Sequence, residues 1–192
     1  MATVREGNQG VLMVVDVQAG VVEKAFDKPR IVANVARTVA RARAAGVPVI
    51  WIQHSGDDLK MGSPEWQWVA ELRPAPGEPL IHKRYESSFE DTTLEAELGK
   101  AGATHIVLAG AATNWCIRAT AYAALDRGYD LTLVKDAHTT ASTDLGNGAR
   151  IEAARVIDDL NIAMTWLSYP GRRNGTATAE QVDFATPGGA RS

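Results

Sequence analysis

The amino-acid sequence predicts an α/β fold, a doubly wound, mainly parallel six-stranded sheet with helices on both faces. The first observation is that short β-branched runs alternate along the chain with longer segments of helical period. The second is composition, because 192 residues, of which 45% are hydrophobic and 22% are charged, suit one compact core. No internal repeat or domain linker divides the chain. We therefore expect a single domain over residues 1–169.

The expected strands are short apolar runs rich in Val, Ile and Leu. In chain order they occupy residues 11–18, 47–53, 79–83, 104–110, 129–136 and 161–167. Segments of helical period predict a helix between Pro29 and Gly46 and further helices over residues 92–100, 114–127 and 148–159. We expect these strands to adopt the doubly wound order 3-2-1-4-5-6.

Two segments lack regular periodicity. Residues 54–78 form a long connection with glycine, proline and two tryptophans, and we expect it to wall a pocket because loops of this length tend to be functional. From Pro170 onward, Gly, Arg, Thr and Ala dominate. We expect residues 170–192 to form a C-terminal tail that is mobile or packed on a partner subunit.

Charge and cysteine content argue against several functions. Lys and Arg number 20 against 23 Asp and Glu, a net charge of −3, and without a basic cluster we expect no nucleic-acid partner. No apolar run is long enough to cross a bilayer and the first ten residues lack a signal-peptide core, so we expect a cytoplasmic protein without membrane contact. The single cysteine excludes an intrachain disulfide and a cysteine zinc cage.

Three ionisable residues follow strand ends that a doubly wound sheet brings together. Asp16 lies near the end of the first strand, Lys83 closes the third, and Cys116 follows the fourth. Ligands of such sheets bind beyond the carboxyl ends, where the strand order reverses, here between the first and fourth strands. Taken singly, Asp16 could belong to a structural ion pair, Lys83 could be a solvated lysine at a strand end, and Cys116 could simply pack in the core. Their expected convergence favours a site.

The three residue types suit nucleophilic catalysis. Thr113 or Asn114 can cap the following helix and place Cys116 in its first turn, where unpaired N–H groups favour a thiolate. The ammonium group of Lys83 would favour the thiolate as well. Asp16 could accept the thiol proton and return it to a leaving nitrogen.

Three motifs resemble those of one known family. The segments VVDVQ with Asp16, KRYESSF with Lys83 and GAATNWCIRATA with Cys116 are similar, in this order, to motifs of the isochorismatase-like cysteine hydrolases. That family includes nicotinamidases, other amidases and streptothricin hydrolase, and the resemblance covers residues 11–167. It implies hydrolysis of a C–N bond in a small amide or lactam through a thioester on Cys116.

The resemblance has further implications for the site and the assembly. It implies a cis peptide bond between Ala111 and Ala112, with the N–H groups of Ala112 and Cys116 forming an oxyanion hole. It also implies a homo-oligomer.

Departures from the family pattern bear on the substrate. The thiol favours acyl chemistry, although a vinyl ether hydrolase of isochorismatase type remains an alternative. A nicotinamidase is a second alternative, but His54 has no second histidine nearby, so we expect no metal site and no cofactor. A catalytically silent binding or scaffold protein of the same fold is the non-enzymatic alternative. A thiol redox protein is disfavoured because there is no resolving cysteine.

Five further residues are candidates for substrate contacts. Trp115, beside Cys116, and Trp66 could form flat pocket walls, and His54 and Tyr85 could be polar contacts at the mouth, with core packing or ordinary surface positions as alternatives. Gln18 is the fifth, and its alternative role is to hold the turn after the first strand. His138 is expected to order a loop rather than act as a base.

Overall fold

The computed structural model describes residues 2–184 of the chain. Its elements follow one another as β1 Gln9–Val15, α1 Lys28–Ala44, β2 Val49–His54, β3 Leu80–Lys83, α2 Leu94–Lys100, β4 Ala103–Ala111, the π-helical turn η1 Thr113–Ile117, α3 Arg118–Asp126, β5 Asp130–Thr139, β6 Thr143–Asp144, β7 Arg150–Ile151, α4 Ala153–Trp166 and β8 Asn174–Ala177. None of the helices in this range is long and apolar enough to cross a membrane.

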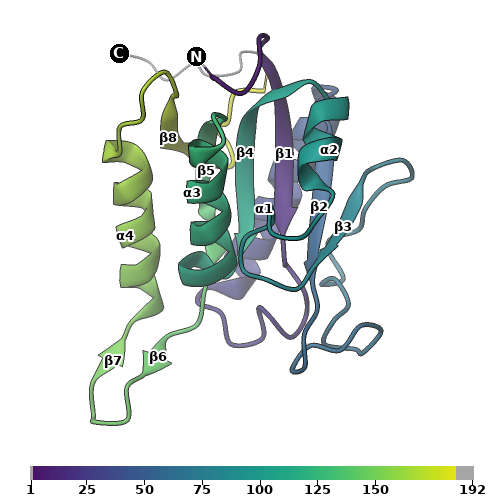
Figure 1. The fold of residues 1–192 in the computed structure, drawn as a ribbon. Helices are drawn as coiled ribbons and strands as arrows, with labels where there is room; N and C mark the ends of the chain where they lie inside the picture. The colour runs from purple at the N-terminus through teal and green to yellow at the C-terminus, as the bar shows by residue number, and fades with distance from the viewer. Residues whose placement is uncertain (1, 185–192) are drawn as a thin grey trace.

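Six strands form one parallel sheet in the order β3-β2-β1-β4-β5-β8. The strand order reverses between β1 and β4, which pair directly at the centre of the sheet. All carboxyl ends therefore point to one edge, at the bottom of Figure 1. The predicted fold class and the reversal between the first and fourth strands are both confirmed.

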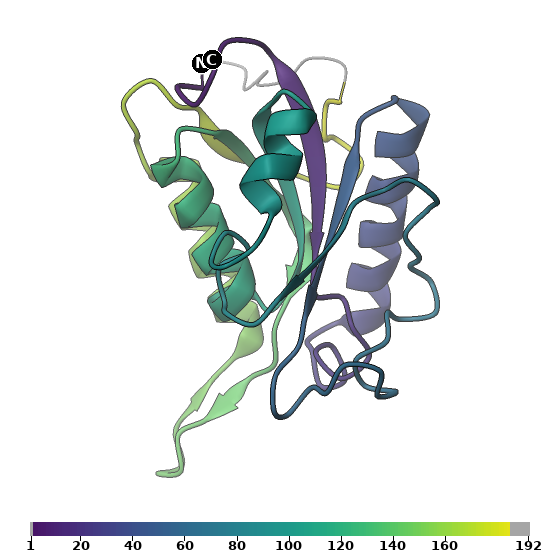
Figure 2. The ribbon, with the colours of Figure 1, turned by 45° about the vertical axis from the view of Figure 1, so that its right-hand side comes forward.

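Two hydrophobic cores lie on opposite faces of this sheet. Helix α1 covers one face, and α2, α3 and α4 cover the other (Figure 2). Strand β1 contributes alternate side chains to each core, Val11 and Met13 to one and Leu12 and Val14 to the other. Because both faces are covered, the strand is apolar without alternation, which is the pattern expected of a central parallel strand.

The last strand is not where the sequence pattern placed it. Residues 161–167 were expected to form a strand, but most of them belong to the carboxyl half of α4. Leu160 and Met164 are fully buried while Ile162 and Trp166 are exposed. This is the spacing of a helix face, since a strand would put Ile162, Met164 and Trp166 on the same side.

The sixth strand comes instead from the segment expected to be a tail. Strand β8 pairs with β5 through residues 174–177, and Ala179 and Val182 beyond it are buried against α1. The guanidinium of Arg41 donates hydrogen bonds to the carbonyl oxygens of both Ala179 and Val182. Residues 170–184 are therefore packed on their own chain. Residues 185–192 lie outside the described residues, and contact of this segment with a partner subunit stays a prediction.

A second unpredicted element is the hairpin of β6 and β7. Its second strand, β7, occupies residues that were expected to begin a helix, and the hairpin projects from the body beyond the carboxyl edge of the sheet (Figures 1 and 2). Gly146 and Gly148, both with positive φ, lie in its turn. The helix was expected to begin at residue 148, but α4 begins at Ala153, directly after the hairpin.

One glycine explains how the central strands approach each other at the carboxyl edge. Gly110 has a φ of 131°, and a Cβ atom at this position would lie 2.0 Å from the carbonyl oxygen of Val15. Only glycine fits such a backbone contact. The close approach sets the end of β1 directly beside the end of β4, so that Asp16 and the turn after Ala111 become neighbours in the fold.

Candidate active site

A buried ion pair marks the carboxyl edge of the sheet. Lys83 is the last residue of β3, and its Nζ lies 2.7 Å from Oδ2 of Asp16, which directly follows β1. Both side chains are inaccessible to solvent. Asp16 has a φ of 51°, a left-handed conformation that is uncommon for a residue with a side chain and that collects at functional sites.

The ammonium group of Lys83 has four neighbours for its three protons. Besides the contact with Asp16, Nζ donates to the carbonyl oxygen of Tyr85 at 2.9 Å and to Sγ of Cys116 at 3.2 Å. The fourth neighbour is Nδ1 of His54, at 3.3 Å. The structure thus brings together the three residues that the sequence predicted to converge, with Lys83 in contact with both of the others.

The thiol sits on an unusual turn. Cys116 is the fourth residue of η1, which begins after Ala112 and leads directly into α3. Trp115 and Ile117 both donate their backbone N–H groups to the carbonyl oxygen of Ala112. The peptide bond between Ala111 and Ala112 is cis, as the resemblance implied. The N–H group of Ala112 makes no backbone hydrogen bond within residues 2–184, and its part in an oxyanion hole stays a prediction.

The expected helix cap is wrong. Ala112 occupies the N-cap position, and no side chain caps the turn. The side chain of Thr113 instead pairs with Nδ1 of His138, at 2.9 Å, and Oδ1 of Asn114 accepts from Oγ1 of Thr140, at 2.6 Å. Both candidates for the cap therefore attach the turn to the carboxyl end of β5, Thr113 to His138 within the strand and Asn114 to Thr140 directly after it.

Burial dominates the ionisation of the thiol. Burial, and after it the negative charge of Asp16, raise the pKa of Cys116 to about 12 against the opposing effect of Lys83. Lys83 lowers the pKa of Cys116, as the sequence suggested, but burial and Asp16 outweigh it, so the expected thiolate is wrong for the free protein. Cys116 is a neutral thiol at pH 7, so its proton must leave as the sulfur reacts.

The carboxyl group of Asp16 is adapted to carry that proton. Burial raises its pKa, and the charge and hydrogen bond of Lys83 oppose the increase. Its Oδ2 faces Lys83, whereas Oδ1 has no N–H or O–H donor among the described residues. Asp16 and the thiol of Cys116 each perturb the pKa of the other. With no N–H or O–H donor on Oδ1 in residues 2–184, the thiol of Cys116 is the hydrogen-bonding partner of this carboxyl group besides Lys83, so Asp16 is placed to accept the thiol proton.

His54 is held in place by Gln18. The amide of Gln18 accepts from the backbone N–H of His54 at 2.9 Å and donates to its carbonyl oxygen at 3.0 Å. Nε2 of Gln18, which makes the bond to the His54 carbonyl oxygen, also donates to the carbonyl oxygen of Trp66. Burial and the charge of Lys83 lower the pKa of His54, so a neutral ring presents Nδ1 to the ammonium group. Gln18 itself is fully buried, which matches the alternative that it holds the turn.

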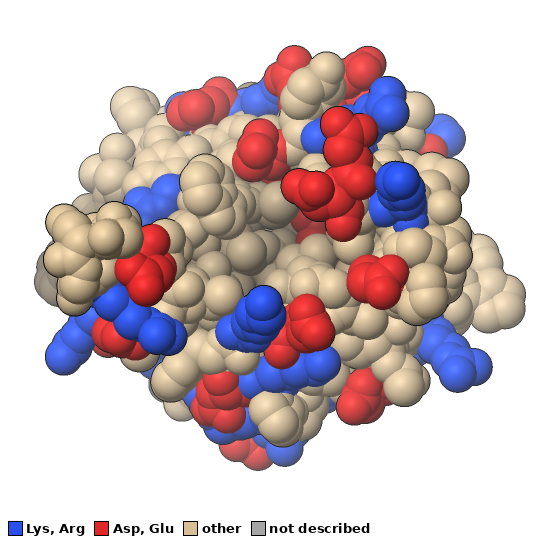
Figure 3. All heavy atoms as spheres, turned by 90° about the horizontal axis from the view of Figure 1, so that it is seen from below, with Lys and Arg blue, Asp and Glu red and all other residues tan. Residues whose placement is uncertain are grey.

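Two cavities flank the loop after β2. One, of about 500 Å³, is lined by Lys83 and Tyr85, and the other, of about 440 Å³, is lined by His54. Seen along the strands from below, this face is hollowed, with acidic side chains on one side of the hollow (Figure 3). The acidic residues that line the cavity beside His54 are Glu23, Asp57, Asp58 and Glu65. The long connection after β2 thus walls a pocket, as expected.

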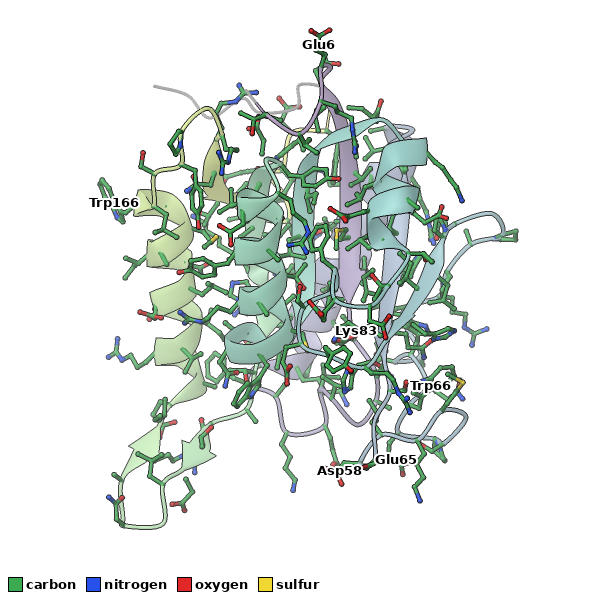
Figure 4. All side chains as sticks on the ribbon, in the orientation of Figure 1. Glu6, Asp58, Glu65, Trp66, Lys83 and Trp166 are labelled. Atoms are coloured by element: carbon green, nitrogen blue, oxygen red, sulfur yellow. The ribbon has the colours of Figure 1, made fainter. Side chains whose placement is uncertain are left out.

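The two candidate tryptophans lie differently. Trp115 is 60% exposed although it adjoins Cys116. Trp66 stacks on His82 with ring centroids 5.7 Å apart, and it does not line the cavities described here. Figure 4 places Trp66 to one side of Lys83, on the outer loops. Tyr85, 51% exposed, lines the larger cavity. A substrate contact of each of these residues stays a prediction.

Metal-binding side chains do not gather at the site. Within residues 2–184 there is no group of three or more His, Cys, Asp or Glu residues that could hold a metal ion. His105 and His138 lie apart from His54, and each hydrogen-bonds to a threonine.

Sequence reasoning did not anticipate the pairing of Thr113 with His138 and of Asn114 with Thr140. The local signal is the composition of the two segments, TN directly after Ala112 and HTT at residues 138–140, across the end of β5. Such polar residues at neighbouring strand ends can meet, but only the register of β4 and β5, in which Gly110 pairs with His138, decides which ones do.

The chain is similar to known proteins of one family. It matches the Isochorismatase domain over residues 10–165. It is 36% identical over 135 residues to a streptothricin hydrolase of Streptomyces noursei, covering 67% of this chain and 54% of that protein. It is 31% identical over 157 residues to the ureidoacrylate amidohydrolase RutB of Variovorax paradoxus (strain S110), covering 65% and 60% respectively. The chain thus spans about half the length of the curated relatives it matches.

Solved structures agree with the sequence match. A crystal structure of an isochorismatase from Pseudomonas putida KT2440 superposes with a TM-score of 0.80 and 27% sequence identity, covering 90% of this chain and 89% of that one. The family model also spans the three segments that carry Asp16, Lys83 and Cys116. The matched domain and the shared fold together show that this chain belongs to the isochorismatase family.

Proposed function

We propose that this protein is a hydrolase that cleaves a C–N bond of a small amide or lactam, with Cys116 as nucleophile. One observation carries the proposal: Nζ of Lys83 lies within hydrogen-bonding distance of both the Asp16 carboxylate and the Cys116 sulfur. A nucleophile, a proton carrier and a fixed cation then share one buried site. The names of two relatives, a streptothricin hydrolase and a ureidoacrylate amidohydrolase, support the same class of reaction.

The first half of the reaction forms a thioester. Asp16 takes the proton of the Cys116 thiol while the sulfur attacks the substrate carbonyl carbon, and the carbonyl oxygen becomes an oxyanion. The N–H groups of Ala112 and Cys116 are the proposed donors to that oxyanion. When the C–N bond breaks, Asp16 returns its proton to the departing nitrogen, which leaves as ammonia or an amine. Lys83 stabilises the transient thiolate and keeps the Asp16 carboxylate oriented.

The second half regenerates the thiol. Asp16, again a carboxylate, accepts a proton from a water molecule whose oxygen attacks the thioester carbonyl carbon. The resulting intermediate collapses, the C–S bond breaks, and the carboxylic acid departs. The proton held by Asp16 returns to the sulfur. The raised pKa of Asp16 suits both transfers, because a carboxyl group that holds a proton readily can act as acid as well as base.

A substrate screen tests the proposal. The panel contains primary amides, lactams, ureido compounds and nicotinamide, with isochorismate included for the vinyl ether alternative. Because carboxylates line the cavity beside His54, each neutral amide is paired with an analogue that carries an amino group. Acid formation that disappears in Cys116→Ala, with the fold of the variant checked by circular dichroism, is the expected result. Turnover that survives in Cys116→Ala would overturn the assignment of the nucleophile, and a panel without acid formation above that control would favour the silent binding protein.

We also propose a homo-oligomer in the cytoplasm. Trp166 is 80% exposed on the outer face of α4 and projects away from the body (Figure 4), and Ile162 lies one turn before it. Leu145 and Ile151 are exposed on the projecting hairpin, which is too small to be stable on its own. Light scattering should give a multiple of 20.6 kDa at micromolar concentration, and a species of 20.6 kDa alone would contradict the oligomer. Cell fractionation tests the location.

A further inference from the structure

We propose that His138 is a positioning residue for Cys116, which holds the thiol-bearing turn in place through Thr113 while its own ring is fixed by Asn161. The inference rests on the proposed role of Cys116 and extends it to a residue outside the Asp16, Lys83 and Cys116 cluster. His138 is fully buried near the end of β5 and hydrogen-bonds to two other elements, η1 and α4.

The hydrogen bonds of Asn161 determine the tautomer of this histidine. Nδ2 of Asn161 donates to the carbonyl oxygen of Lys135 at 3.1 Å, so its Oδ1, 3.0 Å from Nε2 of His138, must accept. Nε2 therefore carries a proton. Burial lowers the pKa of His138 to about 4, so the ring is neutral at pH 7 and Nδ1 has a lone pair. Nδ1 then accepts the hydroxyl proton of Thr113, at 2.9 Å.

A second hydrogen bond acts on the next residue of the same turn. Oγ1 of Thr140 donates to Oδ1 of Asn114 at 2.6 Å. The first two residues of η1, three and two residues before the thiol, are thus attached by their side chains to His138 on β5 and to Thr140 directly after it. With no side-chain cap on the turn, these attachments fix its position against the sheet.

The position of η1 matters because the thiol of Cys116 contacts a side chain from another strand over a short distance. Lys83 reaches the thiol from β3, which β2 and β1 separate from β4 in the sheet, and its Nζ is 3.2 Å from Sγ. A displacement of η1 by about 1 Å would break that contact, and errors of this size in the position of a reacting group cost about 100-fold in rate.

His105 offers a matched comparison within the same sheet. It too is buried, burial also lowers its pKa to about 4, and its Nε2 lies 2.9 Å from the hydroxyl group of Thr132. Both residues of this second pair lie within strands, His105 on β4 and Thr132 on β5, far from η1. Loss of the His105 pair should therefore weaken the fold without moving the thiol.

The test compares His138→Gln with His105→Gln, and Thr113→Val with Thr113→Ser. Two readouts are taken: kcat and KM on a substrate from the screen, and the rate at which iodoacetamide alkylates Cys116. We expect His138→Gln and Thr113→Val to lower kcat by about 10- to 100-fold with KM within about twofold, and to slow alkylation because the sulfur loses Lys83. Thr113→Ser, which keeps the hydroxyl, should restore both, and His105→Gln should leave both near the wild-type values.

Alkylation separates this inference from the proposed function, because it reports the position of the thiol whether or not a substrate has been found. Cys116→Ala supplies the background, since the chain has no other cysteine. If His138→Gln fails to fold, the smaller change Thr113→Val still tests the link. Wild-type alkylation and kcat in Thr113→Val would overturn the positioning role, as would equal losses in His105→Gln and His138→Gln.

Discussion

Two buried aspartates at opposite edges of the sheet meet basic side chains in different ways. Asp130, at the start of β5, accepts the backbone N–H of Arg173 on Oδ1 at 2.8 Å and its guanidinium on Oδ2 at 3.1 Å. Asp16, after the end of β1, meets Lys83 through Oδ2 at 2.7 Å and leaves Oδ1 without an N–H or O–H donor in the described part of the chain. Both oxygens of the first carboxylate accept from N–H donors, whereas the second carboxylate, within residues 2–184, has an N–H donor on one oxygen only and the weaker S–H donor of Cys116 besides.

The difference separates a structural ion pair from one arranged for chemistry. The side chain of Arg173 is 44% exposed, so water solvates the cation and the pair joins β5 to the start of β8 at little cost. Lys83 and Asp16 are both removed from water, and such pairs give stability only when every polar atom is satisfied. An incompletely satisfied buried pair is poor for stability, but it suits a carboxyl group that must accept and release a proton.

The largest expected effect is on turnover. Asp16→Asn removes the proton carrier and should lower kcat/KM by about 10²- to 10⁴-fold, the usual contribution of a general acid and base. Asp130→Asn should leave kcat/KM within about threefold, because its pair lies at the other edge of the sheet. Steady-state rates on a substrate from the screen measure both. Equal losses of kcat/KM in the two variants would contradict the different roles given to Asp16 and Asp130.

The next effect is on stability. Lys83→Met leaves the Asp16 carboxyl group buried without its cation and should lower the free energy of unfolding by about 3 to 5 kcal/mol. Arg173→Met removes a partly solvated cation and should cost about 1 kcal/mol or less, discounted for screening by water. Urea unfolding at pH 7 compares the two. A larger loss of unfolding free energy in Arg173→Met than in Lys83→Met would contradict the different costs expected for the two ion pairs.

The smallest expected effect is on the pH dependence of stability. The pKa of Cys116 is about 12 in the folded protein against an ordinary value of 9.0, so between these values the folded state holds the thiol proton more tightly than the unfolded state. Stability contributed by this group is therefore complete below pH 9 and is lost as the pH rises towards 12. Unfolding measured at pH 8 and pH 10.5 should show a smaller decline in Cys116→Ala than in the wild type. Parallel declines would contradict the raised pKa.

Local pattern was enough for most of the fold. Five of the six sheet strands and the helix between Pro29 and Gly46 follow from apolar periodicity and from the breaking residues at their ends. The pattern failed over residues 161–167, where β-branched and aromatic residues suited a strand, and it missed β8, whose four residues carry no apolar run. Whether such segments are helix or strand depends on the surface they cover, and that surface is built by residues far away in the sequence.

The sequence by itself determined which chemical groups the site contains and which strand ends they follow. Asp16, Lys83 and Cys116 could be identified because the carboxyl ends of parallel strands lie at one edge of the sheet. Only the tertiary structure decided that the thiol is neutral, that Oδ1 of Asp16 has no N–H or O–H donor, and that Thr113 bonds to His138 rather than capping its turn. Ionisation and hydrogen bonding depend on desolvation and on distances of a few tenths of an ångström, which are set jointly by every element packed around the site.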